Sequence, residues 1–364
     1  MLKKYRVLKW IAISLVSITV IVVSVGVWFK SLIPSIDQSI KDTKPSHLNY
    51  LTEHKIPYRG NVLIVVTSTD KMGSTTKTTG YELTEVSRAY YTFKANGFEV
   101  DIASPKGGTP PVVIDKEDMG KYDYAFLNDS NAQEKIKNTI ALDKVQPDKY
   151  QAVYFAGGKG TMFDFPDNTA IQNIVKNYYQ TNKVIGAVCH GPAALVNVTL
   201  DNGKKLLSGK KISSFTNKEE LLLIKDAKTV FPFLLQDKIQ EQGAVFKEGA
   251  MYLEQISQDR NIVTGQNPWS TWKVAEQMIH QLGYRPKHRQ ITSEENSVAI
   301  LLAYHSKGKS AAKQQIEELL KKDTKAVDRI LLLKHSLMAA MQFKIGDFYS
   351  VASLASHAKK YQEK

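Results

Sequence analysis

Apolar residues follow three different patterns along the chain. The first is an uninterrupted run of 20 uncharged residues from Trp10 to Phe29, which as a helix would span the roughly 30 Å of a bilayer's hydrocarbon core. In the second, short apolar runs alternate with segments whose apolar residues recur at helical spacing. After about Arg285 only the helical spacing continues. The patterns therefore predict an N-terminal transmembrane helix, an α/β domain and a C-terminal all-helical extension.

The first pattern predicts an uncleaved signal anchor within residues 1–30, with residues 10–29 in the membrane. A cleaved signal peptide is the main alternative, but its apolar part is usually about 7–15 residues long and ends in small residues. This run is longer and ends in Trp28 and Phe29. Basic residues precede it, which predicts a cytoplasmic amino terminus and a globular part on the extracytoplasmic side. These basic residues are Lys3, Lys4, Arg6 and Lys9.

The second pattern begins after a segment rich in interruptions. Residues 31–58 contain three prolines and are predicted to form a linker. From Asn61 a β-branched run predicts a buried strand, and the apolar spacing in residues 83–93 predicts a helix that ends at Gly97. Further strand and helix patterns alternate after it, which is typical of a mostly parallel sheet flanked by helices. Ligands of such sheets bind at the carboxyl ends of the strands.

Charge is unevenly distributed over the chain. Its 364 residues carry a formal net charge of +13, but residues 31–284 hold 29 basic and 28 acidic side chains. This near neutrality argues against nucleic-acid binding, which needs a basic face. Residues 285–364 hold 15 basic and 8 acidic side chains, a net charge of +7. They are predicted to form a small helical subdomain packed on the core; a docking module for a partner protein or for anionic lipid is the alternative.

Composition excludes several classes of protein. With 43% hydrophobic and 23% charged residues, the chain is neither disordered throughout nor a multispanning membrane protein. A single cysteine excludes a disulfide framework and any cysteine-based zinc site.

That cysteine, Cys189, lies between a predicted strand and a predicted helix in the segment VIGAVCHGPAAL. The positive end of a helix dipole stabilises a thiolate, which is the nucleophilic form of cysteine. An inert core cysteine is the alternative. Because His190 follows directly and the small residues after it free backbone N–H groups for an oxyanion, the context favours catalysis.

Five motifs occur in order between residues 59 and 284. They are TTGYELTEVSRAYYTFKANGFEVDIASPKGGTPP, YQAVYFAGGKGTMFDFPDN, VIGAVCHGPAALVNV, ISSFTNKEE followed by VFPFLLQDKIQEQGAVF, and NIVTGQNPWS. Together they resemble the ThiJ/PfpI superfamily, whose flavodoxin-like fold is that of the class I glutamine amidotransferases. Within it the segment resembles most closely the branch of glutathione-independent glyoxalases (glyoxalase III) and stress chaperones.

The resemblance implies a catalytic triad. By position the nucleophile is Cys189, its histidine is His190, and the acidic partner is Glu220, with Glu219 as the near rival. Glu85 corresponds to the acidic residue that in this family approaches the cysteine sulfur from the first helix.

The glycine-rich turn is implied to bind an oxyanion through the backbone N–H groups of Gly157 and Gly158, together with that of His190. Glu82, one turn before Glu85, is predicted to be solvated. The chain departs from the usual pattern at Lys159, where a histidine is common and where substrate preference is expected to change. It also departs at Ala89 and Ala156, which replace prolines.

The implied activity is a membrane-anchored, glyoxalase III-like conversion of methylglyoxal or a related 2-oxoaldehyde to a 2-hydroxy acid. A thiolate attacks the aldehyde to give a hemithioacetal, and His190 or Glu85 then moves a proton through an enediol. The chemistry implies no metal or organic cofactor, and relatives commonly form homodimers. The alternatives are a stress chaperone with a non-essential cysteine and a cysteine-dependent peptidase, amidase or deglycase.

Overall fold

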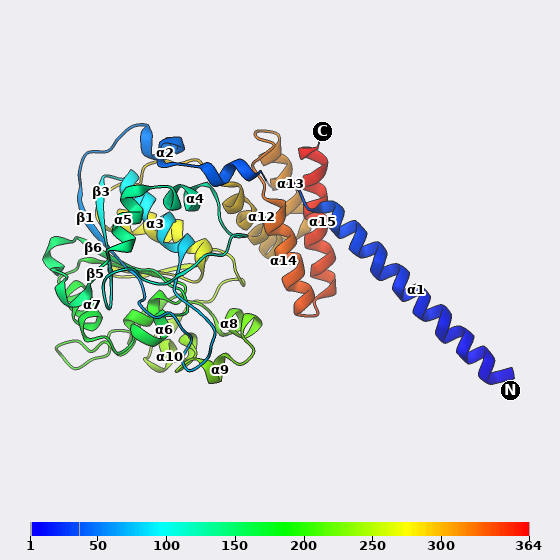
Figure 1. The fold of residues 1–364 in the computed structure, drawn as a ribbon, viewed down its shortest axis with the longest axis horizontal. Helices are drawn as coiled ribbons and strands as arrows, with labels where there is room; N and C mark the ends of the chain where they lie inside the picture. Colours follow the sequence, from blue (N-terminus) through cyan, green and yellow to red (C-terminus); the bar gives the residue numbers. More distant parts are fainter. Residues whose placement is uncertain (1, 36, 364) are drawn as a thin grey trace. The chain divides into compact units, whose positions relative to one another are not determined.

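The computed structural model describes residues 2–35 and 37–363 and forms two compact units (Figure 1). The central unit comprises Gln38–Gln290, and the terminal unit comprises Met1–Asp37 together with Ile291–Lys364. Residues 38–58 therefore belong to the central unit and do not form the linker that the prolines predicted. The reason is apolar burial, because Leu48 and Tyr50 lie in the core of that unit.

A seven-stranded sheet forms the centre of this unit, in the order β10-β11-β7-β6-β1-β3-β5. Its strands are parallel except for β10, which pairs antiparallel with β11. The bounds are β1 (Gly60–Val65), β3 (Phe98–Ser104), β5 (Ile140–Ala141), β6 (Ala152–Phe155), β7 (Val184–Val188), β10 (Ile256–Asp259) and β11 (Ile262–Gly265). Two small parallel sheets pair β2 (Tyr81–Glu82) with β4 (Val112–Val113) and β8 (Lys211–Ile212) with β9 (Val245–Phe246).

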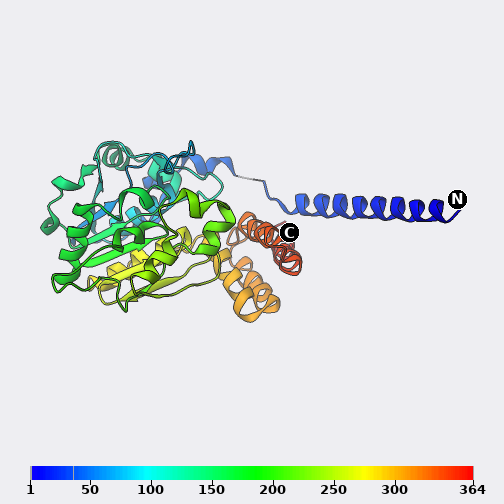
Figure 2. The same cartoon turned by 90° about the horizontal axis from the view of Figure 1, so that it is seen from below.

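Helices cover both faces of the large sheet (Figures 1 and 2). One apolar cluster joins the sheet to α3, α4, α5 and α11, and a second joins the opposite face to α6, α7 and α10. The α-helices are α2 (Asn49–Thr52), α3 (Leu83–Ala95), α4 (Lys121–Leu127), α5 (Ser130–Lys137), α6 (Thr161–Asp164), α7 (Thr169–Gln180), α8 (Asn217–Leu223), α9 (Ala227–Val230), α10 (Leu235–Glu241) and α11 (Thr271–Gln281). Short 3₁₀ helices are η1 (Gln38–Asp42), η2 (Pro45–His47), η3 (Leu142–Lys144), η4 (Pro147–Lys149), η5 (Gly191–Leu195) and η6 (Pro268–Ser270). The predicted α/β fold with a mostly parallel sheet is confirmed.

The terminal unit is all helical, as predicted for the end of the chain. It contains α1 (Leu2–Leu32), α12 (Ser293–Lys307), α13 (Lys309–Leu320), α14 (Arg329–Met341) and α15 (Ile345–Gln362). Within α1, the stretch Lys9–Leu32 has a mean hydropathy of 2.5 and is long and apolar enough to cross a membrane, a test that a signal sequence also passes. The side chains of residues 2–8 and of Ile21 lie outside the described part, so of the predicted orienting charges only Lys9 is described, and it is exposed.

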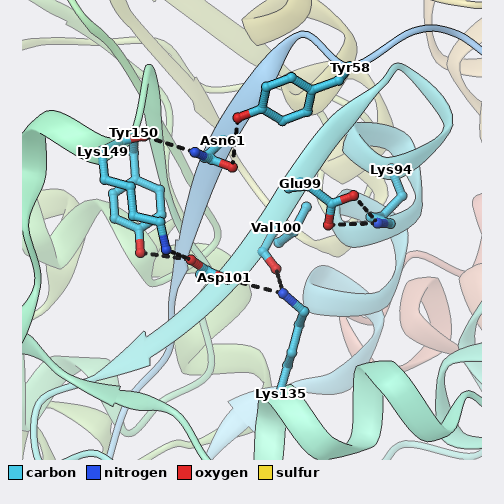
Figure 3. Close-up of polar contacts among 9 residues, drawn as sticks. All are labelled: Tyr58, Asn61, Lys94, Glu99, Val100, Asp101, Lys135, Lys149 and Tyr150. Atoms are coloured by element: carbon cyan, nitrogen blue, oxygen red, sulfur yellow. Dashed lines mark hydrogen bonds and ion pairs between the residues drawn. The ribbon is translucent and has the colours of Figure 1, made fainter.

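A cluster of polar side chains around Asp101 joins β3 to α5 and to the segment before β6 (Figure 3). Its carboxylate accepts hydrogen bonds from Lys135 (3.0 Å), Lys149 (2.8 Å) and the Tyr150 hydroxyl (2.9 Å). Burial opposes the charge, but these hydrogen bonds outweigh it and lower the pKa of Asp101 to about 2. The neighbouring pair between Lys94 and Glu99 is more exposed.

Replacing Asp101 with Asn is expected to lower the urea midpoint of unfolding at pH 7. The native pKa of about 2 lies below the roughly 3.9 of an unfolded aspartate, so the contribution is complete above pH 4 and is lost as the pH falls through 2. The difference between the two proteins should therefore shrink between pH 4 and pH 2. Glu99→Gln is the matched control and should change the midpoint little at either pH. An equal effect of Asp101→Asn at pH 7 and pH 2 would contradict this account.

Candidate active site

The site is built around a sharp turn at the end of β7. Cys189 follows the last residue of that strand and has φ +59°, a conformation that costs an L-residue about 1–2 kcal/mol. Two backbone hydrogen bonds hold it there. The Cys189 N–H donates to the carbonyl of Gly265 (3.0 Å), and the Cys189 carbonyl accepts from the N–H of Phe215 (2.9 Å). The turn takes the sulfur out of the strand direction and places it in a pocket.

That pocket has a volume of about 270 Å³ and opens at the carboxyl ends of the strands, as the fold class predicts. Its lining includes Glu82, Glu85, Lys159, Cys189, His190 and Tyr252. Among the described residues no group of three or more His, Cys, Asp or Glu side chains is arranged to hold a metal ion.

His190 lies between the thiol and a carboxylate. Its Nδ1 is 3.3 Å from the Cys189 sulfur, and its Nε2 is 2.5 Å from Glu220 Oε2. Burial alone would raise the pKa of Glu220, but the charge of His190 and its hydrogen bond lower that pKa below the usual value. A charged Glu220 fixes the tautomer in which Nε2 carries the proton, so Nδ1 is free to accept one from the thiol. The structure thus brings together the three side chains that the resemblance implied for a triad.

Glu219 has a different set of contacts. Its carboxylate accepts hydrogen bonds from the backbone and hydroxyl of Thr216, the N–H of Tyr252 and the side-chain amides of Gln266 and Asn267. These bonds cap α8 and join it to the loops before β10 and after β11. Glu219 is therefore a buried structural residue, and the geometry favours Glu220 as the partner of His190.

Glu85 reaches the site from the first turn of α3 and is fully buried. Its Oε2 accepts a hydrogen bond of 2.6 Å from the Gly157 N–H, and its Oε1 has no hydrogen-bond partner among the described residues. Burial, reinforced by the nearby charge of Glu82, raises the pKa of Glu85 well above its usual range. Burial therefore favours the protonated form of this carboxyl.

The thiol of Cys189 is also held in its protonated form. Burial raises its pKa well above the usual value, and Glu85 raises it further, while the charge of Lys159 acts in the opposite direction. This direction is opposite to the one expected from a helix dipole. The segment after the cysteine is a five-residue 3₁₀ helix, η5, whose dipole is outweighed by the loss of solvent. The thiol and the Glu85 carboxyl each shift the pKa of the other, so the two groups titrate as a coupled pair.

The paired glycines have separate roles. The N–H of Gly157 is taken by Glu85, so it positions that carboxyl and is not the oxyanion donor that the resemblance implied. No acceptor in the described part of the chain faces the N–H groups of Gly158 and His190, which leaves both for an oxyanion. Gly158 has φ +101°, and a Cβ there would lie 2.2 Å from the carbonyl oxygen of Gly80, so only glycine fits.

Lys159 and Glu82 both line the pocket, and the charge of one affects the pKa of the other. No hydrogen bond or ion pair holds the Lys159 ammonium among the described residues, and its charge lowers the pKa of Glu82, Glu220 and Cys189. Glu82 is not the freely solvated side chain predicted. It is partly buried in the pocket wall, and burial raises its pKa to about 8 against the effect of Lys159.

Two aromatic residues complete the site without having been singled out in the sequence. The ring of Phe215 lies 4.6 Å from that of His190, and the ring of Tyr252 lies 5.7 Å from Phe215. Phe215 begins the FTNKEE segment, five residues before Glu220. Its position in that motif could have identified it as a residue of the site. Nothing in the sequence marks Tyr252, because it reaches the pocket from a loop that only the fold brings near.

The model of the DJ-1/PfpI family matches this chain over residues 76–281, and the chain belongs to that family. The match includes every side chain of the pocket described above and confirms the resemblance to the ThiJ/PfpI superfamily.

Several curated relatives are similar over nearly their whole length. Glyoxalase 3 of Candida albicans is 32% identical over 235 residues, which cover 60% of this chain and 96% of that protein. The glutathione-independent glyoxalase HSP31 of Saccharomyces cerevisiae is 31% identical over 236 residues, with 61% and 97% coverage. The branch of the family that the motifs indicated is thereby confirmed.

Solved structures agree with this placement. The Rapid Encystment Protein of 24 kDa from Francisella tularensis is 37% identical with a TM-score of 0.59, covering 62% of this chain and 99% of its own. The structure of glyoxalase III from Candida albicans is 30% identical with a TM-score of 0.56, with 61% and 97% coverage.

Alkylation of Cys189 by iodoacetamide tests the proton arrangement, because the chain has no other cysteine to react. Glu85→Gln removes a group that raises the thiol pKa and should move the pH midpoint of alkylation downward. Lys159→Met removes a group that lowers it and should move the midpoint upward. Intact-mass measurements of the alkylation rate over a pH series that extends well above the usual thiol pKa follow both shifts, and the urea-unfolded chain gives the unperturbed reference. Shifts in the same direction for the two variants would refute the assignment.

Proposed function

We propose that this protein is a glyoxalase III-like enzyme that converts methylglyoxal or a related 2-oxoaldehyde to a 2-hydroxy acid without glutathione. The observation that carries the proposal is the line of contacts from the Cys189 sulfur to His190 (3.3 Å) and on to Glu220 (2.5 Å), with Glu85 on the other side of the pocket. The relatives named as glutathione-independent glyoxalases give the reaction class.

The first step makes the nucleophile and uses it. The thiol proton passes to Nδ1 of His190, and Glu220 stabilises the resulting imidazolium. The sulfur then attacks the aldehyde carbon, a C–S bond forms, and the aldehyde oxygen becomes an alkoxide. The free N–H groups of Gly158 and His190 are the donors available to that oxygen. A proton returned to the alkoxide completes the hemithioacetal.

The second step moves hydrogen between neighbouring carbons. A base removes the proton from the former aldehyde carbon, and an enediol forms with the adjacent carbonyl. Return of a proton to the second carbon gives a thioester of the 2-hydroxy acid, which water hydrolyses to regenerate the thiol. His190 and Glu85 are the two groups in position to carry these protons. The first carbon is oxidised as much as the second is reduced, so the reaction needs no external oxidant.

The same proposal includes a membrane anchor. The stretch Lys9–Leu32 is apolar enough to span a bilayer, and its described side chains are mostly exposed. With the basic residues before it on the cytoplasmic side, the enzyme lies on the extracytoplasmic side.

Cys189→Ala is the direct test of the enzyme. Lactate formation from methylglyoxal by the full chain in detergent should fall by at least about 100-fold, because no other thiol is available. Lactate is measured together with methylglyoxal consumption, and the melting temperature shows that the variant is folded. If Cys189→Ala keeps the full rate, the proposed chemistry is wrong. Suppression of client aggregation that is equal in both proteins would then favour the chaperone alternative.

Glu220→Gln and Glu219→Gln form a matched pair of neighbouring substitutions. Glu220→Gln should lower kcat by about 100-fold or more with little change in melting temperature, because His190 loses the carboxylate that stabilises its charge. Glu219→Gln should instead destabilise the fold by about 1–3 kcal/mol, because buried donors lose their acceptor. The opposite pattern would exchange the two roles.

A further inference from the structure

The turn between α14 and α15 presents an apolar surface to the outside. Phe343, at its tip, is 90% exposed. The exposed apolar side chains of this surface, called the apolar turn below, are Leu337, Met341, Phe343, Ile345 and Tyr349. Isolated exposed apolar residues are ordinary, but five within 13 residues on one turn form a patch that indicates an interaction site.

Backbone hydrogen bonds fix the conformation of the apolar turn. This conformation favours glycine or asparagine at position 343, where the chain has phenylalanine. The N–H of Lys344 donates to the carbonyl of Ala339, and the N–H of Phe343 donates to that of Ala340, both at 2.9 Å. This is the Schellman arrangement of a helix end, in which the residue with positive φ is usually glycine or asparagine. Here that residue is Phe343, with φ +59°. The chain therefore keeps a strained backbone at a residue whose aromatic ring is almost fully exposed.

The neighbour of the apolar turn within the terminal unit is the end of α1. The ring of Trp28 stacks on that of Tyr349 at 6.3 Å, and the ring of Phe29 stacks on that of Phe348 at 5.8 Å. Further along α15, the Lys359 ammonium donates to the carbonyl of Ser31 (2.6 Å). Tyr349 belongs both to this contact and to the apolar turn. The apolar turn thus contacts the end of the proposed membrane span through Tyr349, which lies about 6 Å along α15 from Ile345 by helical rise.

The charges nearby suit a lipid headgroup region. Lys344 follows Phe343 and is exposed, and Lys30 is exposed at the end of α1. Basic side chains beside exposed aromatic and aliphatic ones are typical of segments that lie in a membrane interface.

We propose that the apolar turn inserts into the interfacial region of the leaflet from which α1 emerges, so that the terminal unit rests on the membrane surface at two points. The proposal depends on the membrane anchor proposed above. The occupant is lipid because the patch adjoins the end of a helix whose own described side chains are exposed and apolar. A second copy of the chain or a partner protein would give different outcomes below.

The experiment uses the full chain in lipid nanodiscs of phosphatidylcholine and phosphatidylglycerol. Cys189→Ser removes the native thiol, and a single cysteine carrying the fluorophore NBD is then placed at one of three positions. Phe343→Cys reports on the apolar turn, Lys322→Cys on an exposed position at the end of α13, and Val22→Cys on the span. Quenching by lipids with a shallow or a deep doxyl group measures contact with each depth.

The expected result is deep quenching at position 22 and shallow quenching at position 343 that is at least threefold greater than at position 322. Quenching at 22 with equal quenching at 343 and 322 overturns the interfacial turn and leaves the anchor standing. No quenching at position 22 overturns the membrane anchor. It also overturns the proposed insertion of the apolar turn, which depends on that anchor. A blue-shifted NBD spectrum at 343 without lipid quenching indicates a protein neighbour and also overturns the proposal.

Phe343→Gly separates membrane contact from folding. Glycine suits the positive φ, so the melting temperature should stay equal or rise. With NBD at Met341→Cys, the same substitution should reduce shallow quenching at least twofold, because the anchoring ring is gone. Unchanged quenching would overturn the role of Phe343.

Discussion

The hydrogen bond from the Gly157 N–H to Glu85 is the contact on which the rest of the site depends. It ties the glycine turn after β6 to the first turn of α3 and fixes a fully buried carboxyl beside Cys189. Burying a carboxylate is costly, so the pKa of Glu85 lies well above its usual range. Glu85 in turn raises the pKa of the Cys189 thiol beyond the effect of burial alone.

The same contacts act on the thiol of Cys189. Burial and Glu85 raise the pKa of this thiol well above the usual value, and the imidazole of His190 lies 3.3 Å from its sulfur. Glu220 orients that imidazole, and Lys159 favours the charged form of the sulfur. In the mechanism proposed above, the nucleophile is therefore formed by proton transfer from the thiol to His190. Lys159 and Glu82 line the same pocket as Cys189 and His190.

Both units contain a residue with a strained backbone conformation. Such strain persists where other interactions stabilise the conformation. In the central unit the strained residue is Cys189, and backbone hydrogen bonds from two neighbouring segments fix it. In the terminal unit the strained residue is Phe343, whose ring is almost fully exposed and so is little stabilised by burial. A membrane interface beside the end of α1 would supply the missing stabilisation.

The sequence alone determined the α/β class, the helical end of the chain and the residues at the centre of the site. Periodicity carries the first two, because burial on one face of a helix or on both faces of a parallel sheet leaves a local pattern. Motif order carries Cys189, His190 and Glu220. Tertiary structure alone decided the rest. It chose Glu220 over Glu219, gave the Gly157 N–H to Glu85, buried Glu82, brought Tyr252 to the pocket and made residues 38–58 part of the core. It also raised the pKa of the thiol, where the local pattern predicted a stabilised thiolate. The reason is that desolvation and the proximity of side chains depend on which distant segments pack together, and no local pattern records that.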